Sequence, residues 1–427
     1  MFPFLEVLTA ISIKLTLLFA HPIFWLVIGF IAFQYMRMEK ARNQLFKVNT
    51  SEWFSTTLQA VGYGFVGGLF GSFIMVFLGL TLSGVGLIYL WPLALLLMII
   101  NPRFLCFAYA GGLLSLASLL FGWPPINVPQ ILALVAILHL IESVLIYYNG
   151  KANAVPVYVK IDYRVEPQSI YGDVDLGNKK SLIGGFVLQR FWPIPLAVLI
   201  IMDSTAVELT EMLQMPDWWP LFKLAVDVEP DLLVFSLIPV VAALGYGDMV
   251  FARKPEQKAR SSAVYLFIYS MILLILAILS EYLFIIGIIA SLFSFVGHEA
   301  IIYIGRKAEM AHQPIYVPID KGVKVLDVLP KTPAFEAGIR SGDVILAIDG
   351  IELNSKLELE YLVKYRNVFE ISFISNVDKA YKKERVVMNS KHFGVLPVPE
   401  GYENTYIELS SSSILKKWLE KGAKYGR

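Results

Sequence analysis

Long apolar runs separated by short polar segments dominate the first 300 or so residues of the chain. A run of about 17 to 25 apolar residues is long enough to cross a lipid bilayer as a helix. Crossings are predicted within residues 22–35, 59–82, 85–100, 104–121, 129–148, 184–202, 232–251, 263–279 and 282–304. The pattern therefore predicts an α-helical multi-pass membrane domain over residues 1–305, with about eight or nine helices.

Two parts of this region allow other arrangements. Residues 1–20 are expected to lie along the membrane surface rather than across it. The run at 85–100 is short and has Gly84, Pro92 and Pro102 in or beside it. A broken or re-entrant pair of helices is therefore the alternative for residues 85–121.

Lysine and arginine gather in segments that alternate between the apolar runs. They lie at 37–47, 151–180, 253–260 and 306–307. Because basic residues accumulate in cytoplasmic loops, these segments and the chain that follows residue 307 are predicted to be cytoplasmic. Residues 149–183 form a polar insert in which valines alternate with other residues from Val155, so a strand is predicted there.

Composition supports the membrane class. The 427 residues are 56% hydrophobic and 17% charged, with a mean hydropathy of +0.62. The lipid bilayer is thus the first expected partner. The net charge of +1 gives no electrostatic reason to expect a nucleic acid partner.

Small residues are dense between positions 62 and 72. Gly64 and Gly67, and then Gly67 and Gly71, are spaced so that another helix backbone can approach closely. The partner helix belongs either to this chain or to a second copy, in which case the chain self-associates.

The stretch from residue 322 to 350 has a different, local pattern. Alternation over 323–328 predicts a strand, which Pro330 ends. A helical turn is predicted at 334–337, and Gly338 follows where a helix end needs a left-handed residue.

Further turns and strands follow in the same region. Ser341-Gly342-Asp343 turns the chain into a strand at 344–348, and Asp349-Gly350 is a strong hairpin signal. Ser355 with Glu358 predicts a capping box that opens a helix to about residue 365. Strands are also predicted at 369–374 and 385–388.

Residues 330–345 match the motif P-x-S/T-P-A-x-x-A-G-hydrophobic-x-x-G-D-x-I, which resembles that of bacterial PDZ domains. The resemblance implies a mixed α/β PDZ-like domain over 315–399, joined by a linker at 306–314. Its motif residues are Pro333, Ala334, Gly338, Gly342, Asp343 and Gly350. PDZ domains bind an extended peptide as an added strand.

By this resemblance the peptide-binding groove lies between the strand at 323–328 and the helix that begins at Ser355. The expected groove residues are Val323, Val325, Leu326, Leu359 and Leu362. The glycine-containing loop that binds a terminal carboxylate is absent upstream, where residues 314–318 read PIYVP. An internal segment or a folded surface is therefore an alternative ligand to a free C-terminus.

Candidate catalytic chemistry is sparse. His139 and Glu142 share one helix face, and His298-Glu299 begins the sequence HEAII, in which Ile302 replaces the second histidine of a metalloprotease motif. Cys106, the single cysteine, is interpreted as a small buried hydrophobic residue. No catalytic residue, metal site or cofactor is predicted, and the protein is not expected to be an enzyme.

Residues 400–427 are predicted to be a tail with a short basic amphipathic helix, in which Ile414, Leu415, Trp418 and Leu419 alternate with lysines. Such a helix binds an anionic membrane surface or a partner, or else frays in solvent.

Taken over its full length, the chain resembles the MinJ family of division-site membrane proteins of Gram-positive bacteria, which join a polytopic region to a cytoplasmic PDZ domain. The resemblance implies a scaffold at the septum and poles that links DivIVA-type proteins to the MinC and MinD inhibitors. Two alternatives remain: a PDZ-bearing component of a membrane protease or secretion system, and a transporter with a regulatory PDZ domain.

Overall fold

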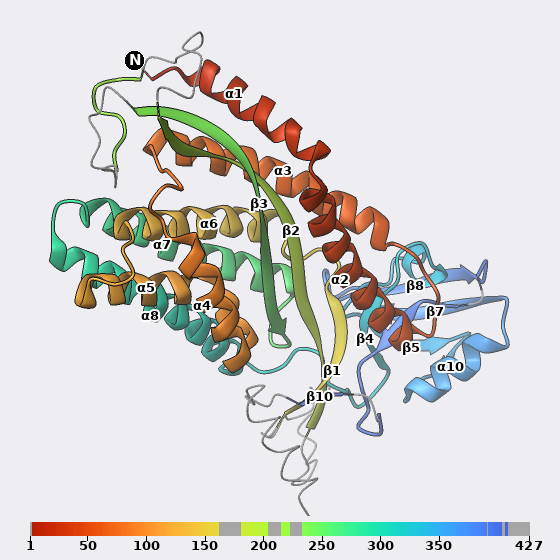
Figure 1. Cartoon of the computed structure of the whole chain (residues 1–427). Helices are drawn as coiled ribbons and strands as arrows, with labels where there is room; N and C mark the ends of the chain where they lie inside the picture. Colours follow the sequence, from red (N-terminus) through yellow and green to blue (C-terminus); the bar gives the residue numbers. More distant parts are fainter. Residues whose placement is uncertain are drawn as a thin grey trace, which may run out of the picture.

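The computed structural model describes residues 2–161, 181–203, 215–222, 233–390, 392–403 and 406–408. Helices pack on both sides of a long, curved pair of strands, and a smaller α/β unit sits at one end of this assembly (Figure 1). The helical part and the small unit have separate hydrophobic cores. The predicted division into a helical membrane region and a mixed α/β region is confirmed.

The helical part contains eight α-helices and two 3₁₀ turns within the described residues. These are α1 (Phe4–Leu17), η1 (Leu18–Ala20), α2 (Pro22–Phe46), α3 (Trp53–Leu78), α4 (Leu87–Ile100), η2 (Pro102–Leu105), α5 (Phe107–Phe121), α6 (Val128–Asn149), α7 (Pro255–Leu279) and α8 (Phe284–Met310). Length and hydropathy mark α3, α6, α7 and α8 as candidate membrane spans, and the bent pair of residues 4–20 and α2 adds a fifth. The chain is a multi-pass membrane protein.

The expected helices at 184–202 and 232–251 are wrong, because both segments are strands. β2 (Ser181–Asp203) pairs antiparallel with β3 (Leu233–Val250) along its length, and β1 (Val155–Ile161) and β10 (Ile407–Glu408) complete a sheet of order β10-β1-β2-β3. Run length alone does not separate a buried strand from a buried helix. Pro193 and Pro195, two residues apart, would interrupt a helix but suit one edge of a strand.

β2 continues past the end of β1, and other groups then satisfy its open edge. The Tyr35 hydroxyl donates to the Phe191 carbonyl at 2.7 Å and accepts from the Phe191 N–H at 3.0 Å. The Ser72 and Ser83 hydroxyls accept from the N–H groups of Ala197 and Ile201. Strands survive in an apolar setting only where such backbone groups are paired or buried in protein.

The Leu199 carbonyl accepts from the Leu82 N–H at 2.8 Å. Two further positions on this edge, Pro193 and Pro195, have no N–H to satisfy. Their carbonyls lie directly against α3. A Cβ atom built on Gly64 would lie 2.0 Å from the Pro193 oxygen, and one built on Gly68 would lie 1.9 Å from the Pro195 oxygen. Glycine is therefore the residue that lets the α3 and β2 backbones touch.

The other glycines of this stretch face a second element. Gly67 and Gly71 lie against Ile141 of α6, and Gly67 also lies near Leu145. The close helix packing predicted for these small residues thus occurs within the chain for one face of α3. The other face contacts a strand, which the sequence interpretation did not anticipate.

Basic residues meet acidic residues at one end of the membrane part, where α6, α7 and α8 have termini. Lys151 lies 3.0 Å from Glu256, Lys258 lies 3.2 Å from Asp248, and Arg253 lies 3.1 Å from Glu309. This is the end that carries the α/β unit (Figure 1). Residues 306–310, predicted as a linker, are instead the last turns of α8.

The α/β unit contains the elements that its local pattern predicts and one further strand. They are β4 (Val323–Val328), α9 (Pro333–Glu336), β5 (Val344–Ile348), β6 (Ile351–Glu352), α10 (Lys356–Lys364), β7 (Val368–Ile374), β8 (Tyr381–Val387) and β9 (Val395–Pro397). The sheet order is β8-β7-β5-β4-β9, with β6 beside β5. Strand β9 was not predicted.

The turns have the expected chemistry. Gly338 ends α9 at φ +82°, and Asp349 and Gly350 have φ of 48° and 78°, as a two-residue hairpin of this type requires. The Asp343 carboxylate accepts from the N–H groups of Arg340 and Asn376, both at 2.8 Å, and so joins the α9 turn to the end of β7.

At the start of α10, one half of the predicted capping box forms and the other half uses the N–H of Asn354 instead of that of Ser355. The Ser355 hydroxyl accepts from the Glu358 N–H, as predicted, whereas the Glu358 carboxylate accepts from the Asn354 N–H. The strand expected in the polar insert is confirmed over 155–161. The rest of that insert at 162–180, and the expected amphipathic helix after residue 410, lie outside the described residues.

Candidate functional site in the PDZ-like unit

The strand expected to line a peptide groove is not at an edge of the sheet. β4 pairs with β5 on one side, where Val323 lies opposite Ile345, and with β9 on the other, where Val325 lies opposite Pro397. A peptide cannot add as a strand where both neighbours are already present. The predicted location of the groove beside 323–328 is therefore wrong.

The five expected groove residues have different surroundings. Val323, Val325 and Leu359 are buried in the core of the α/β unit. Leu326 is buried in the core of the membrane part, where its side chain lies over Gly184 of β2. Leu362 packs against the small core but is only partly buried.

β9 occupies the place beside β4 that the sequence interpretation left open for a ligand. Its surrounding sequence, Phe393-Gly394-Val395-Leu396, has the hydrophobic-glycine-hydrophobic pattern that was sought upstream at 314–318. The Gly394 carbonyl accepts from the Leu329 N–H, which fixes this segment to the end of β4. The signal was thus present in the sequence, but it lies downstream of β8.

The outer side of β9 is partly covered by the membrane part. The Tyr158 hydroxyl of β1 donates to the Pro397 carbonyl at 3.2 Å. Two longer ion pairs join α2 to the same unit, between Arg42 and Asp327 at 3.9 Å and between Lys47 and Glu360 at 3.8 Å. The α/β unit is therefore docked on the end of α2, with the side of α10 that carries Glu360 facing it.

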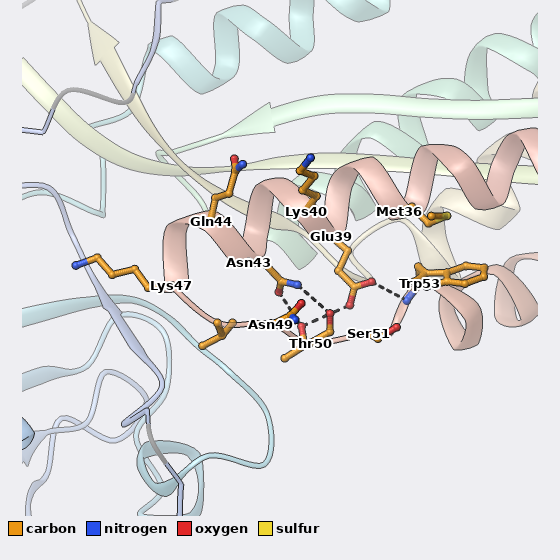
Figure 2. A pocket seen from close by; sticks show the side chains of 11 residues that line it. Met36, Glu39, Lys40, Asn43, Gln44, Lys47, Asn49, Thr50, Ser51 and Trp53 are labelled. Carbon is orange, nitrogen blue, oxygen red and sulfur yellow. Dashed lines mark hydrogen bonds between the residues drawn. The ribbon is translucent and has the colours of Figure 1, made fainter.

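A shallow pocket of about 620 Å³ lies at the turn between α2 and α3, next to this contact (Figure 2). The Glu39 carboxylate accepts from the Trp53 N–H at 3.0 Å, and Asn43 and Thr50 are hydrogen bonded to each other. Figure 2 shows these side chains turned toward one another, with Lys47 pointing away from them. The polar groups of the pocket thus hold the turn in shape rather than pointing at a ligand.

α10 also carries exposed apolar side chains. Leu357, Tyr361 and Tyr365 are 61%, 65% and 68% exposed. Their spacing of four residues places them along one face of the helix, and the two tyrosine rings lie 5.2 Å apart. We call these three residues the α10 stripe. From this helix, the sequence interpretation assigned only Leu359 and Leu362 to a binding surface, so it did not identify the stripe.

Asp327 gives the docked unit a pH dependence. Its side chain is 19% exposed, and burial raises the pKa of Asp327 to about 6, although Arg42 and the Val328 N–H act in the opposite direction. At this carboxyl the folded chain therefore binds more protons than the unfolded chain between about pH 6 and 4. Asp327 should therefore contribute about 1 kcal/mol more to stability at pH 5 than at pH 7.

Thermal unfolding of the full chain in detergent at pH 7 and pH 5 measures this effect. Asp327→Asn should be the less pH-dependent protein, because an amide does not titrate. Equal pH dependence in the variant and the parent would show that Asp327 does not carry a raised pKa.

Three of the polar residues within the helical part form a group that the sequence interpretation did not predict. Cys106, His139 and His298 come together from three segments, with the Cys106 sulfur 3.0 Å from Nε2 of His139. Cys106 is thus in contact with imidazoles rather than purely apolar groups. Glu299 lies beside this group and pairs with Arg103 at 3.0 Å.

Comparisons with known proteins address both parts of the chain. The PDZ domain family matches residues 302–367. The Bacillus subtilis cell division topological determinant MinJ is 21% identical over 422 residues, which cover 92% of this chain and 96% of that protein. The similarity to MinJ thus includes the membrane part as well as the α/β unit.

Two shorter similarities concern smaller parts of the chain. The Synechocystis putative serine protease HhoA is 43% identical over 53 residues, which are 12% of this chain and only 14% of the protease. The PDZ domain of a Listeria innocua SdrC-like protein is 20% identical, covering 20% of this chain and 99% of that structure, with a TM-score of 0.16.

Proposed function

We propose that this chain, a MinJ-like membrane protein with a C-terminal PDZ domain, is a non-catalytic adaptor that recruits cytoplasmic cell-division proteins to the membrane. The similarity to MinJ over 422 residues carries the proposal, because it spans the membrane part and the PDZ domain together. Partners of the DivIVA and MinC/MinD type, and a position at septum and poles, follow from it as parts of the same proposal.

The charge distribution supports a cytoplasmic PDZ domain. Lys151, Arg253 and Lys258 lie at the end of the membrane part that carries this domain. Basic residues favour the cytoplasmic side of a membrane protein. Placing this end in the cytoplasm makes the PDZ domain accessible to cytoplasmic division proteins.

The α10 stripe is the surface that we assign to partner binding. Exposed tyrosines that are held on a rigid helix are typical anchors of protein interfaces, since they bury a large area at low entropic cost. The three side chains are exposed while the PDZ domain is docked on α2, so a partner can reach them without undocking it. The stripe also avoids the β4 edge, which is closed.

A double substitution tests this assignment. Tyr361→Glu with Tyr365→Glu should weaken partner binding by about 30-fold or more, as the loss of a hot spot worth about 2 kcal/mol does. Tyr381→Glu is the matched control, because Tyr381 is 57% exposed on β8, at the far edge of the same sheet. Loss of binding in the control but not in the α10 variant would show that the partner binds at β8 rather than at the α10 stripe.

The function itself is tested by crosslinking from membranes, comparing the full chain with a chain that lacks the PDZ domain. Division proteins of the DivIVA or MinC/MinD type should be captured by the full chain only. Deletion of the gene should produce filaments and misplaced septa. Normal septum placement together with accumulation of uncleaved membrane substrates would instead support the second candidate function.

That second candidate is a PDZ module of a membrane protease system, which the HhoA similarity favours. The similarity is confined to 53 residues, a length that is too short for a serine protease catalytic domain. If the chain serves a protease, it therefore contributes substrate or partner binding rather than a serine nucleophile.

A further inference from the structure

Cys106, His139 and His298 converge inside the helical part from segments that are far apart in the sequence. Cys106 caps the start of α5, His139 is near the middle of α6, and His298 is on α8. The Cys106 sulfur lies 3.0 Å from Nε2 of His139 and 3.7 Å from Nε2 of His298. All three donor atoms lie within 4.8 Å of one another.

These separations are those of ligands around one metal ion. In a tetrahedral zinc site, with Zn–S near 2.3 Å and Zn–N near 2.0–2.1 Å, the sulfur and nitrogen donors are about 3.5 Å apart. The two sulfur–nitrogen distances here lie on either side of that value.

Hydrogen bonds on the outer nitrogens turn both imidazoles toward the sulfur. Nδ1 of His139 lies 2.7 Å from the Val135 carbonyl, which can only accept, so this nitrogen carries the proton. Nε2 of His139 is then unprotonated, and its lone pair faces Cys106. An outer hydrogen bond to a backbone carbonyl is the usual way in which proteins orient a metal-binding histidine.

His298 is oriented by a longer chain of groups. Its Nδ1 lies 3.3 Å from the Tyr109 hydroxyl, which donates to the Glu299 carboxylate at 2.7 Å. The Tyr109 oxygen therefore accepts from Nδ1, and Nε2 of His298 is also unprotonated. Arg103 holds Glu299 in place at 3.0 Å. This is the carboxylate-supported arrangement common behind histidine ligands.

The two Nε2 lone pairs thus both face the Cys106 sulfur, which has at most one proton to share with them. A thiol has one proton, so Cys106 can donate to one imidazole only, and the other Nε2 then faces the sulfur without a proton between them. A cation that accepts all three lone pairs removes this conflict. One thiolate and two imidazoles suit Zn²⁺ among the common ions, whereas Mg²⁺ and Ca²⁺ prefer oxygen donors.

We infer that Cys106, His139 and His298 bind one Zn²⁺-class transition-metal ion, which ties the start of α5 to α6 and α8. Three protein ligands leave one coordination position open for water or a further donor. Tyr269 of α7 packs its ring edge-on against both imidazoles, at centroid distances of 5.7 and 5.6 Å, so four segments surround the site. Glu299 and Tyr109 position His298 and do not bind the ion.

Cobalt provides a direct test on the full chain purified in detergent. Co²⁺ should bind with a thiolate-to-cobalt charge-transfer band, and Zn²⁺ should displace it at one ion per chain. Cys106→Ser should abolish the band, and His139→Ala and His298→Ala should each weaken binding by more than the roughly 10- to 100-fold that loss of an outer-shell partner costs. His312→Ala is the matched control, because His312 is exposed beyond α8 and bonds only to its own turn.

A second measurement needs no substitution of the cysteine. Cys106 is the single cysteine of the chain, so alkylation of the protein reports on this thiol alone. Zn²⁺ should slow alkylation at least 10-fold in the parent and in His312→Ala, but not in His139→Ala or His298→Ala. If Zn²⁺ leaves the alkylation rate of the parent unchanged, or if Co²⁺ gives no thiolate band in protein that elutes as a folded species, the site is a thiol–imidazole hydrogen bond and the inference is wrong.

Discussion

Gly68→Val is expected to prevent stable folding of the membrane part, whereas Gly62→Val should be tolerated. A Cβ atom at position 68 would lie 1.9 Å from the Pro195 carbonyl oxygen, while nothing lies within 4 Å of one at position 62. Overpacking costs about 1–3 kcal/mol when side chains can move aside. Here the obstacle is backbone, so the helix and strand must separate and the cost should be at the upper end or above it.

The separation would also expose the carbonyls of the β2 edge. Backbone groups in an apolar environment need partners within the protein, so their exposure adds to the loss. The measurement is the amount of monodisperse protein recovered in detergent and its melting temperature. Similar recovery of Gly68→Val and Gly62→Val would show that α3 and β2 do not touch through their backbones.

Glu309→Ala should have the second largest effect. The carboxylate is 4% exposed and accepts from the N–H groups of Phe251 and Ala252 at 2.9 and 2.7 Å, and from Arg253. Removing it leaves two buried backbone donors and a guanidinium without their acceptor. Each unsatisfied buried group costs about 1–3 kcal/mol, so we expect a loss of several kcal/mol.

Glu256→Ala provides the comparison for this prediction. Glu256 also carries two ion pairs, with Lys151 and Arg260, but its side chain is 43% exposed. Exposed ion pairs contribute at most about 1 kcal/mol, so this variant should melt close to the parent. Equal losses in the two variants would mean that Glu309 acts as a surface charge and does not join the end of β3 to α8.

The PDZ-like unit was the most predictable part because its signals are local. Asp349-Gly350 requires positive φ at both positions, and Gly338 follows a helical turn that Pro333 begins, so a few adjacent residues define each turn. The groove was less predictable. Whether β4 is an edge strand depends on where residues 395–397 return, about 70 residues later, and no local pattern states this.

The membrane class followed from the length of the apolar runs, but the type of element did not. Residues 184–202 are apolar on both faces because they are covered on both, and such a run has neither the period of a helix nor that of a strand. Pro193 and Pro195 were the available signal. Whether these prolines could lie in a strand packed on α3 depended on Gly64 and Gly68. These glycines lie more than 120 positions earlier and leave room for the two proline carbonyls.

The sequence by itself determined the properties that rest on composition and near neighbours: a membrane protein, basic segments at one end, and a PDZ-like unit with its turns in place. Tertiary structure alone decided which elements meet, namely the β2–α3 contact, the closed edge of β4, and the group of Cys106, His139 and His298. The Cys106 partners lie 33 and 192 positions away. Local propensity acts over a few residues, whereas donor atoms come within bonding distance only when helices distant in the chain have packed.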